Sequence, residues 1–139
     1  MSNIAQIQLE LIDEFQLFDN WLDRYQYIID LGKQLPEFPD EYRTDDYKLH
    51  GCQSQVWLKA KAENGMLYFQ AASDSAIVSG LIALVMRVYS GQPAAEILST
   101  PPEFIRAIGL SEHLSPTRNN GLAAMVTSIR DQAQACLAA

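Results

Sequence analysis

The strongest constraint on the fold is a β-hairpin encoded between residues 55 and 72. Apolar and polar residues alternate on both sides of Asn64-Gly65, the preferred pair for a two-residue type I′ turn. A loop of these two residues pairs each position before the turn with its mirror position after it. This register matches Ala62 with Leu67, Ala60 with Phe69, and Leu58 with Ala71. All three pairs are apolar, so the strands 55–62 and 67–72 are predicted to share one buried face.

Two amphipathic helices are predicted before the hairpin. Between residues 3 and 18, apolar side chains recur at spacings of three and four: Ile4, Ile7, Leu11, Phe15 and Phe18. Asp19 or Asn20 could cap a second helix, which Gly32 and Pro36 end. Its inward stripe is predicted to be Trp21, Leu22, Tyr25, Ile28 and Ile29. Residues 36–48 then form a polar connection that could include a short extended piece at 47–49.

Further helices are predicted from the hairpin to the end of the chain. Ser73, Asp74 or Ser75 caps a helix that stops at Gly91. Gly80 inside it costs about 1 kcal/mol relative to alanine, which indicates close packing against another backbone. A short helix at 93–98 and a last helix with Ser115 as cap and Pro116 as first residue follow. The predicted fold class is α+β: a small antiparallel sheet, to which a third short strand could add, with helices packed on one face.

Length and charge restrict the organisation and the partners. A chain of 139 residues with 48% hydrophobic content is expected to form a single domain, 1–139. Its net charge of −7, without a basic cluster, argues against nucleic acid and anionic membranes as partners. The first 20 residues are acidic, unlike a signal peptide, and the apolar run 76–86 is too short to span a bilayer. The expected location is the cytoplasm.

The two cysteines, Cys52 and Cys136, are far apart in the sequence. A disulfide framework needs more cysteines, and with only His50 and His113 as further soft ligands no metal site is expected. Cys136 continues the apolar stripe of the last helix, formed by Leu122, Met125, Ile129 and Ala133. It is therefore predicted to be a small, buried hydrophobic residue.

Cys52 lies in a different setting, because no local pattern calls for an apolar side chain there. Gly51 precedes it and permits unusual backbone angles, and its polar neighbours are Gln53, Ser54 and Gln55. Reactivity requires a lowered thiol pKa or a nearby base, which a sequence does not show. From the residues alone, a reactive thiol and a structural one are equally well supported.

Arg118 could stabilise a thiolate at Cys52. It falls in the first turn of the last helix, where the helix dipole favours anions over cations. The poor helix formers Asn119, Asn120 and Gly121 follow it, and such local violations are typical of functional sites. A solvated arginine or a structural ion pair is an equally good interpretation. His50 or His113 could serve as a base, and Asp74 is most simply a helix cap.

Four segments resemble the SufE family of sulfur-acceptor proteins. "GCQSQVWL" (51–58) is similar to the family's cysteine motif. "YIIDLGKQLP" (27–36), "SDSAIVSGLIALV" (73–85) and "HLSPTRNNGLAAM" (113–125) resemble family segments in the family's order. The resemblance covers nearly the whole chain except the first 18 or so residues. It implies a SufE/NifU-like α+β fold.

The resemblance also implies a function. Cys52 would accept sulfane sulfur from a cysteine desulfurase, SufS-like or CsdA-like, and pass it to a cluster scaffold or another acceptor for iron–sulfur cluster assembly. Pyridoxal phosphate would belong to the desulfurase, so this chain would need no cofactor and would act as a transfer partner and activator. Arg118 would lie close to the cysteine loop, and Gly51 could be its hinge. A homodimer is one option for the oligomeric state.

Two other functional classes fit the residues less well. A cluster scaffold needs several cysteine ligands, which this chain lacks. A stand-alone cysteine hydrolase needs a base aligned with Cys52, and no hydrolase motif is present.

Overall fold

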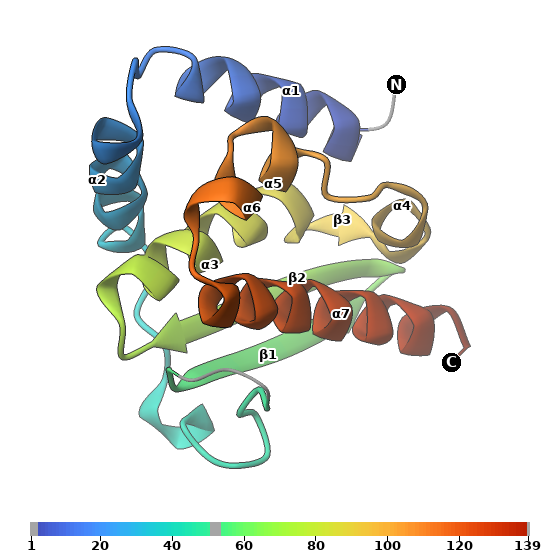
Figure 1. Cartoon of the computed structure of the whole chain (residues 1–139). Coiled ribbons are helices and arrows are strands. Elements are labelled where there is room, and N and C mark those ends of the chain that lie inside the picture. The colour runs from blue at the N-terminus through green and yellow to red at the C-terminus, as the bar shows by residue number, and fades with distance from the viewer. Residues whose placement is uncertain (1–2, 51–53, 139) are drawn as a thin grey trace.

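The computed structural model describes residues 3–50 and 54–138, in which helices pack on one face of a small antiparallel sheet (Figure 1). The elements in chain order are α1 (Asn3–Phe15), α2 (Trp21–Gly32), the 3₁₀ helix η1 (Asp40–Tyr42), β1 (Val56–Glu63), β2 (Met66–Ser73), α3 (Ala76–Tyr89), β3 (Gln92–Pro93), α4 (Ala94–Ser99), α5 (Phe104–Ala107), α6 (Leu110–His113) and α7 (Pro116–Ala138).

The predicted hairpin is confirmed in its strands, turn and register. Ala62 lies opposite Leu67, Ala60 opposite Phe69, and Leu58 opposite Ala71. Asn64 (φ 54°) and Gly65 (φ 79°) both adopt the left-handed conformation that a type I′ turn requires. The buried face does not extend to Ala62, which is exposed beside the turn.

The sheet is extended at both edges by short pieces. The strand order is β1-β2-β3, and β3 pairs with the start of β2 through Gln92 and Pro93. At the other edge Lys48 forms an isolated antiparallel bridge with Trp57 of β1. The extended piece predicted at 47–49 therefore pairs with β1, and the third strand of the sheet is β3.

The helices form the main core on one face of the sheet. Helix α3 packs against β2 and is in turn contacted by α1, α2 and α7 (Figure 1). The largest fully buried side chains come from these elements and from the short helices between α3 and α7: Tyr89, Phe15, Phe104, Ile4, Leu11, Ile28, Leu67, Leu81, Ile82, Leu84, Ile97 and Ile108.

Helices α2 and α3 cross at a pair of glycines. A β-carbon on Gly80 would lie 2.6 Å from the carbonyl carbon of Ile28, and one on Gly32 would lie 2.5 Å from the backbone nitrogen of Gly80. Carbon atoms in contact normally stay about 3.5–4 Å apart, so neither site accepts a methyl group at this separation. The close backbone packing that Gly80 predicted is confirmed.

Side-chain caps fix the starts of helices α2, α3 and α7. Asn20, Ser75 and Ser115 accept hydrogen bonds from first-turn backbone amides at 3.0, 3.4 and 3.2 Å. Asn20 and Ser75 are thus the caps among the alternatives that the sequence left open. The interpretation of Asp74 as a cap is wrong: its carboxylate accepts a hydrogen bond from the backbone N–H of Gln55.

Other predictions differ from the structure at the ends of α1 and α2. Leu22, predicted to face inward, is 78% exposed, because the inner side of this turn is filled by the rings of Trp21 and Tyr25, 6.4 Å apart. Helix α1 ends at Phe15, so Phe18 lies in the following turn, with its ring 4.8 Å from that of Tyr27. The short helix predicted at 93–98 begins one residue later, since Pro93 belongs to β3.

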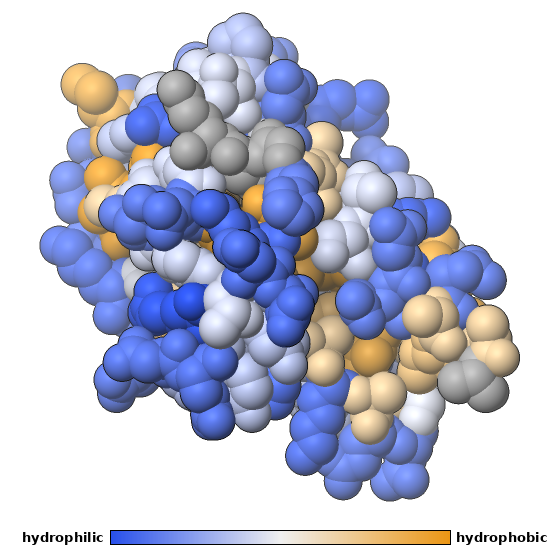
Figure 2. Space-filling view, turned by 90° about the horizontal axis from the view of Figure 1, so that it is seen from below, coloured by the Kyte–Doolittle hydropathy of each residue, from blue (hydrophilic) through white to orange (hydrophobic). Residues whose placement is uncertain are grey.

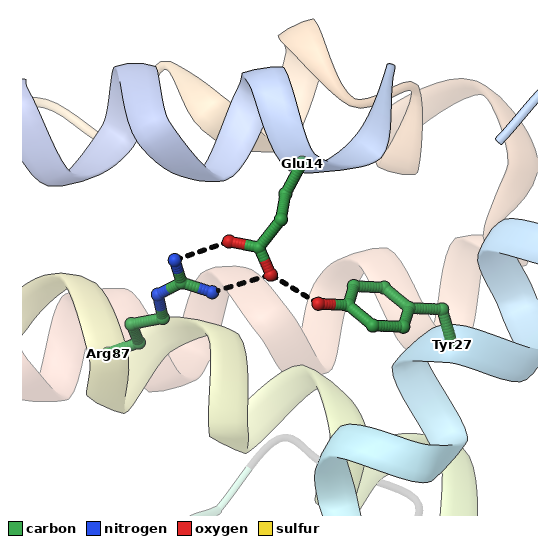
Figure 3. A network of polar contacts seen from close by, with 3 residues as sticks. All are labelled: Glu14, Tyr27 and Arg87. Atoms are coloured by element: carbon green, nitrogen blue, oxygen red, sulfur yellow. Dashed lines mark hydrogen bonds and ion pairs between the residues drawn. The ribbon is translucent and has the colours of Figure 1, made fainter. Parts of the chain in front are cut away.

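One polar network ties α1, α2 and α3 together (Figure 3). The Glu14 carboxylate accepts hydrogen bonds from the Arg87 guanidinium, with Nη1 and Oε1 3.0 Å apart, and from the Tyr27 hydroxyl. The hydrogen bonds from Arg87 hold the pKa of Glu14 below its usual value. Burial, together with the Glu14 carboxylate, raises the pKa of Tyr27. Glu14 therefore stays ionised and Tyr27 neutral around neutral pH.

Among the described residues, those that cover the opposite face of the sheet lie at one end of it. Phe38, Trp57 and Ala72 are buried there, with Tyr42 and Tyr47 packed against them. Viewed from this side, the surface is largely hydrophilic, and hydrophobic residues appear in smaller groups (Figure 2). Within residues 3–50 and 54–138, no helix has the length and hydrophobicity that a membrane span requires.

Candidate functional site

A cavity of about 420 Å³ opens between the start of β1, helix α3 and the first turns of α7. Its lining residues are Ser54, Val56, Val78, Leu81, Ser115, Thr117, Arg118, Gly121, Leu122 and Met125. The apolar members from β1, α3 and the second turn of α7 are mostly buried, whereas Ser115, Thr117 and Arg118 are exposed. The cavity therefore has an apolar floor and a polar rim that carries one positive charge.

The start of α7 positions the rim. Ser115 caps the helix by accepting a hydrogen bond from the backbone N–H of Arg118 at 3.2 Å. Asn119 donates its side-chain amide to the carbonyl oxygens of Ser111 and Leu114, at 3.1 and 3.2 Å. This second tie explains why a poor helix former stands in the first turn: it fixes α7 to the segment before it.

The Arg118 guanidinium carries the positive charge of the rim. Among the residues that the structure describes, no carboxylate lies within ion-pair distance of it, in contrast to the guanidinium groups of Arg43, Arg87 and Arg106. The structural ion pair considered for Arg118 from the sequence is therefore absent from the described part of the chain. The cation also stands beside the N-terminal end of a long helix, which itself favours a negative charge.

Two backbone hydrogen bonds and one to a side chain hold the two ends of segment 50–55. The Leu49 N–H donates to the Val56 carbonyl at 2.8 Å, and the Leu58 N–H donates to the Tyr47 carbonyl at 2.9 Å. The Gln55 N–H donates to an Asp74 carboxylate oxygen at 3.1 Å. The segment that contains Cys52 thus leaves and re-enters the sheet at adjacent, hydrogen-bonded points.

The structure brings some of the predicted site residues together. Ser54 and Arg118 line the same cavity, although they are far apart in the sequence. Asp74 is exposed and lies next to the cavity-side end of segment 50–55 through its bond to Gln55. The predictions for Gly51, Cys52 and Gln53 fall on residues outside the described ranges.

The other candidate residues are not part of the cavity lining. His50 is exposed at the beginning of segment 50–55. His113 stacks on the Trp21 ring, with centroids 4.4 Å apart, so its place is between α6 and α2. Cys136 is a free thiol, partly buried and packed against the main core, which agrees with its predicted hydrophobic role.

Sequence reasoning missed two features of the site: two of the cavity-lining residues, and the contact between Gln55 and Asp74. The lining residues are Val78 and Thr117. Of these, only Thr117 could have been suspected from the sequence, because it stands beside Arg118 in the first turn of α7. The contact between Gln55 and Asp74 could have been found, because these two positions continue the predicted hairpin register by one pair beyond Val56 and Ser73.

Comparison with known proteins assigns the chain to a family. The family model described as "SufE: Fe-S metabolism associated domain" matches residues 9–133. The chain belongs to the SufE family. Family membership and the α+β fold, both predicted from the sequence, are confirmed, and the family's description links the chain to iron–sulfur metabolism.

Individual relatives support the same assignment. An uncharacterised SufE-like protein of Rhizobium etli is 47% identical over 135 residues, which cover 94% of this chain and 91% of the relative. A second uncharacterised SufE-like protein, of Rhizobium meliloti, is 44% identical over 135 residues, covering 94% and 96%. The solution structure of a hypothetical protein from Thermus thermophilus has a TM-score of 0.78 at 22% identity, covering 96% of this chain and 97% of that one. At this identity the structural match shows the fold alone.

Proposed function

We propose that this SufE-family protein takes sulfur from a cysteine desulfurase onto Cys52, stimulates the desulfurase, and passes the sulfur on for iron–sulfur cluster assembly. The observation that carries the proposal is the cavity that Ser54 shares with Arg118. Ser54 stands two positions after Cys52, so a side chain with anion-binding chemistry lies close to the cysteine segment.

The cavity supplies what a sulfur anion needs. A thiolate, the reactive form of cysteine, is stabilised by a nearby guanidinium and by the N-terminal end of a helix. Arg118 and the start of α7 provide both at the rim. The apolar floor, which includes Leu81 and Leu122, keeps water away from one side of the site. An alternative role for the same arginine is direct contact with the desulfurase.

The transfer step is a thiol exchange that needs no external oxidant. The Cys52 thiolate attacks the outer sulfur of the persulfide on the desulfurase. As the new sulfur–sulfur bond forms, the bond within the donor persulfide breaks, and the donor cysteine leaves as a thiolate. Cys52 then carries the persulfide, and a second exchange of the same kind delivers the sulfur to a downstream acceptor.

The chemistry that generates the persulfide is assigned to the partner. A desulfurase of the SufS-like or CsdA-like kind, with its own pyridoxal phosphate, would remove sulfur from free cysteine and release alanine. This chain would contribute the accepting thiol and its surroundings. Such an exchange between two soluble proteins fits the expected cytoplasmic location.

The proposal is tested by the rate at which each candidate desulfurase releases alanine, with and without this protein. We expect the wild-type chain to raise the rate and Cys52→Ser to leave it at the basal value. Arg118→Ala should lower the stimulation by roughly tenfold, because a charge-assisted contact is lost. Arg106→Ala is the matched control, since Arg106 is an exposed arginine on α5 that pairs with Glu103. Equal stimulation by the wild type and Cys52→Ser would refute the proposal.

A further inference from the structure

An aromatic cluster covers one end of the outer face of the sheet, opposite the main core. We call it the outer-face cluster; its members are Phe38, Tyr42, Tyr47, Trp57 and Ala72. The Tyr42 ring stands edge-on to those of Phe38 and Tyr47, with centroids 6.3 and 5.2 Å away. The cluster joins the irregular segment 38–49, which we call the arm, to strands β1 and β2.

Arg43, a residue of the arm, contacts the sheet. Its guanidinium carbon lies 5.2 Å from the ring centroid of Trp57 on β1 and 5.8 Å from that of Phe38 at the start of the arm. Both rings are buried, whereas the ion pair of Arg43 with Asp40 is exposed and contributes little. The cation–π contact with Trp57 therefore joins the arm to β1, whereas the one with Phe38 lies within the arm. A third contact, from Lys59 of β1 to the Tyr42 ring at 4.1 Å, joins the same two elements.

The charge of the arm makes such a tie necessary. The arm contains four carboxylates, all exposed, against two cations, Arg43 and Lys48. Mutual repulsion and hydration of these carboxylates favour an arm that moves away from the sheet into water. Arg43 opposes this by offsetting part of the charge and by binding the buried rings.

The arm leads directly into segment 50–55. Its last residues make the hydrogen bonds from Leu49 to Val56 and from Leu58 to Tyr47, at 2.8 and 2.9 Å. A displaced arm would break both bonds, and Leu49 would no longer be held beside the start of β1. The position of the arm thus decides where the polypeptide enters segment 50–55.

We infer that Arg43 is a positioning residue for sulfur transfer: by clamping the arm to Trp57 of β1, it holds Leu49 beside β1 on the approach to Cys52. The inference rests on the proposed function for its effect on transfer. The clamp itself is a property of residues 38–58 and can be measured without a desulfurase.

Amide hydrogen exchange measures the clamp directly. In Arg43→Ala, protection of the Leu49 and Leu58 amides should fall about fivefold, because two cation–π contacts are lost. Arg43→Lys should recover part of this protection, since lysine keeps the charge but not the planar group. The matched control is Lys61→Ala, because Lys61 lies on the outer face of β1 and pairs with Glu63 rather than with the arm. It should leave both amides unchanged.

Desulfurase stimulation measures the consequence. Arg43→Ala should lower the maximal stimulated rate roughly threefold or more, because misplacing a reacting group slows the chemical step. The desulfurase concentration for half-maximal effect and the Tm should stay near the wild-type values, and Arg43→Lys should restore part of the rate.

Several results would overturn the inference. Unchanged protection of Leu49 and Leu58 in Arg43→Ala would show that no clamp exists. Lowered protection with an unchanged maximal rate, or a fall in Tm with protection lost throughout the protein, would show that Arg43 does not position the site. The proposed function fails separately, if the wild-type chain itself gives no stimulation, and the exchange data then still decide whether the clamp exists.

Discussion

Replacing Gly80 by alanine should destabilise the protein, although alanine is the better helix former. In an ordinary helix the change gains about 1 kcal/mol. Here the added methyl carbon would lie 2.6 Å from the carbonyl carbon of Ile28 and 2.5 Å from its Cγ2. Since the opposing group is partly backbone, no change of rotamer relieves the clash, and α2 must move away from α3.

The size of the effect follows from that movement. To restore an ordinary carbon–carbon contact, α2 and α3 must move apart by roughly 1 Å. This movement forfeits a quarter to a half of the dispersion energy along their contact. Overpacking of this kind costs about 1–3 kcal/mol, and we take about 3–4 kcal/mol because backbone opposes backbone. After the helix-propensity gain, the free energy of unfolding should fall by about 2–3 kcal/mol. The Tm should fall by roughly 10 °C.

Urea and thermal unfolding of Gly80→Ala, followed by circular dichroism, measure both quantities. Gly65→Ala is the comparison: its β-carbon would meet nothing within 4 Å, but its φ is 79°. That variant should lose only about 1 kcal/mol, from left-handed backbone strain. If Gly80→Ala is as stable as the wild type or more so, the close crossing of α2 and α3 does not exist as described.

Three further predictions concern side-chain contacts. Glu14→Gln should lose about 1 kcal/mol at pH 7, from the partly exposed contact with Arg87. Because the pKa of Glu14 is lowered in the fold, this difference should shrink as the pH falls below about 4.5, which urea titrations at several pH values would show. Burial raises the pKa of Tyr89 to about 12, from 10.0 in the unfolded chain. The neutral Tyr89 therefore contributes its full stabilisation up to about pH 10. The wild type should therefore lose stability relative to Tyr89→Phe between pH 10 and 12, and a constant difference in alkaline unfolding curves would contradict this. In Asp74→Ala, hydrogen exchange at the Gln55 amide should be about fivefold faster, and alkylation of Cys52 should also be faster. Asp74→Asn keeps an acceptor oxygen, so both rates should stay near those of the wild type.

The parts of the fold that could be predicted from the sequence are those fixed by local patterns. The hairpin register follows from Asn64-Gly65 and the alternation beside it, and the cap at Ser115 follows from one serine and the proline after it. The crossing at Gly80 could be predicted because a glycine in the middle of an apolar helix makes no turn there, and its missing side chain leaves room for a second backbone.

The parts that could not be predicted depend on contacts between distant segments. No local pattern indicates that the first turn of α7 meets α3 and Ser54. The cavity around Arg118 therefore could not be predicted from the residues alone. The sequence predicts only a polar connection before the hairpin, because an irregular segment has no hydrophobic period, yet Phe38 and Tyr47 of the arm cover the outer face of the sheet. The role expected of Cys52 came from family resemblance and remains a prediction.

The central claim is that Cys52 receives the sulfur. The most direct test is mass spectrometry of peptides from the wild type, Cys52→Ser and Cys136→Ser after incubation with a desulfurase and cysteine. The account predicts a reducible adduct with the mass of one sulfur atom on the Cys52 peptide of the wild type and of Cys136→Ser, and no adduct in Cys52→Ser. An adduct on the Cys136 peptide, or one that persists in Cys52→Ser, would contradict it.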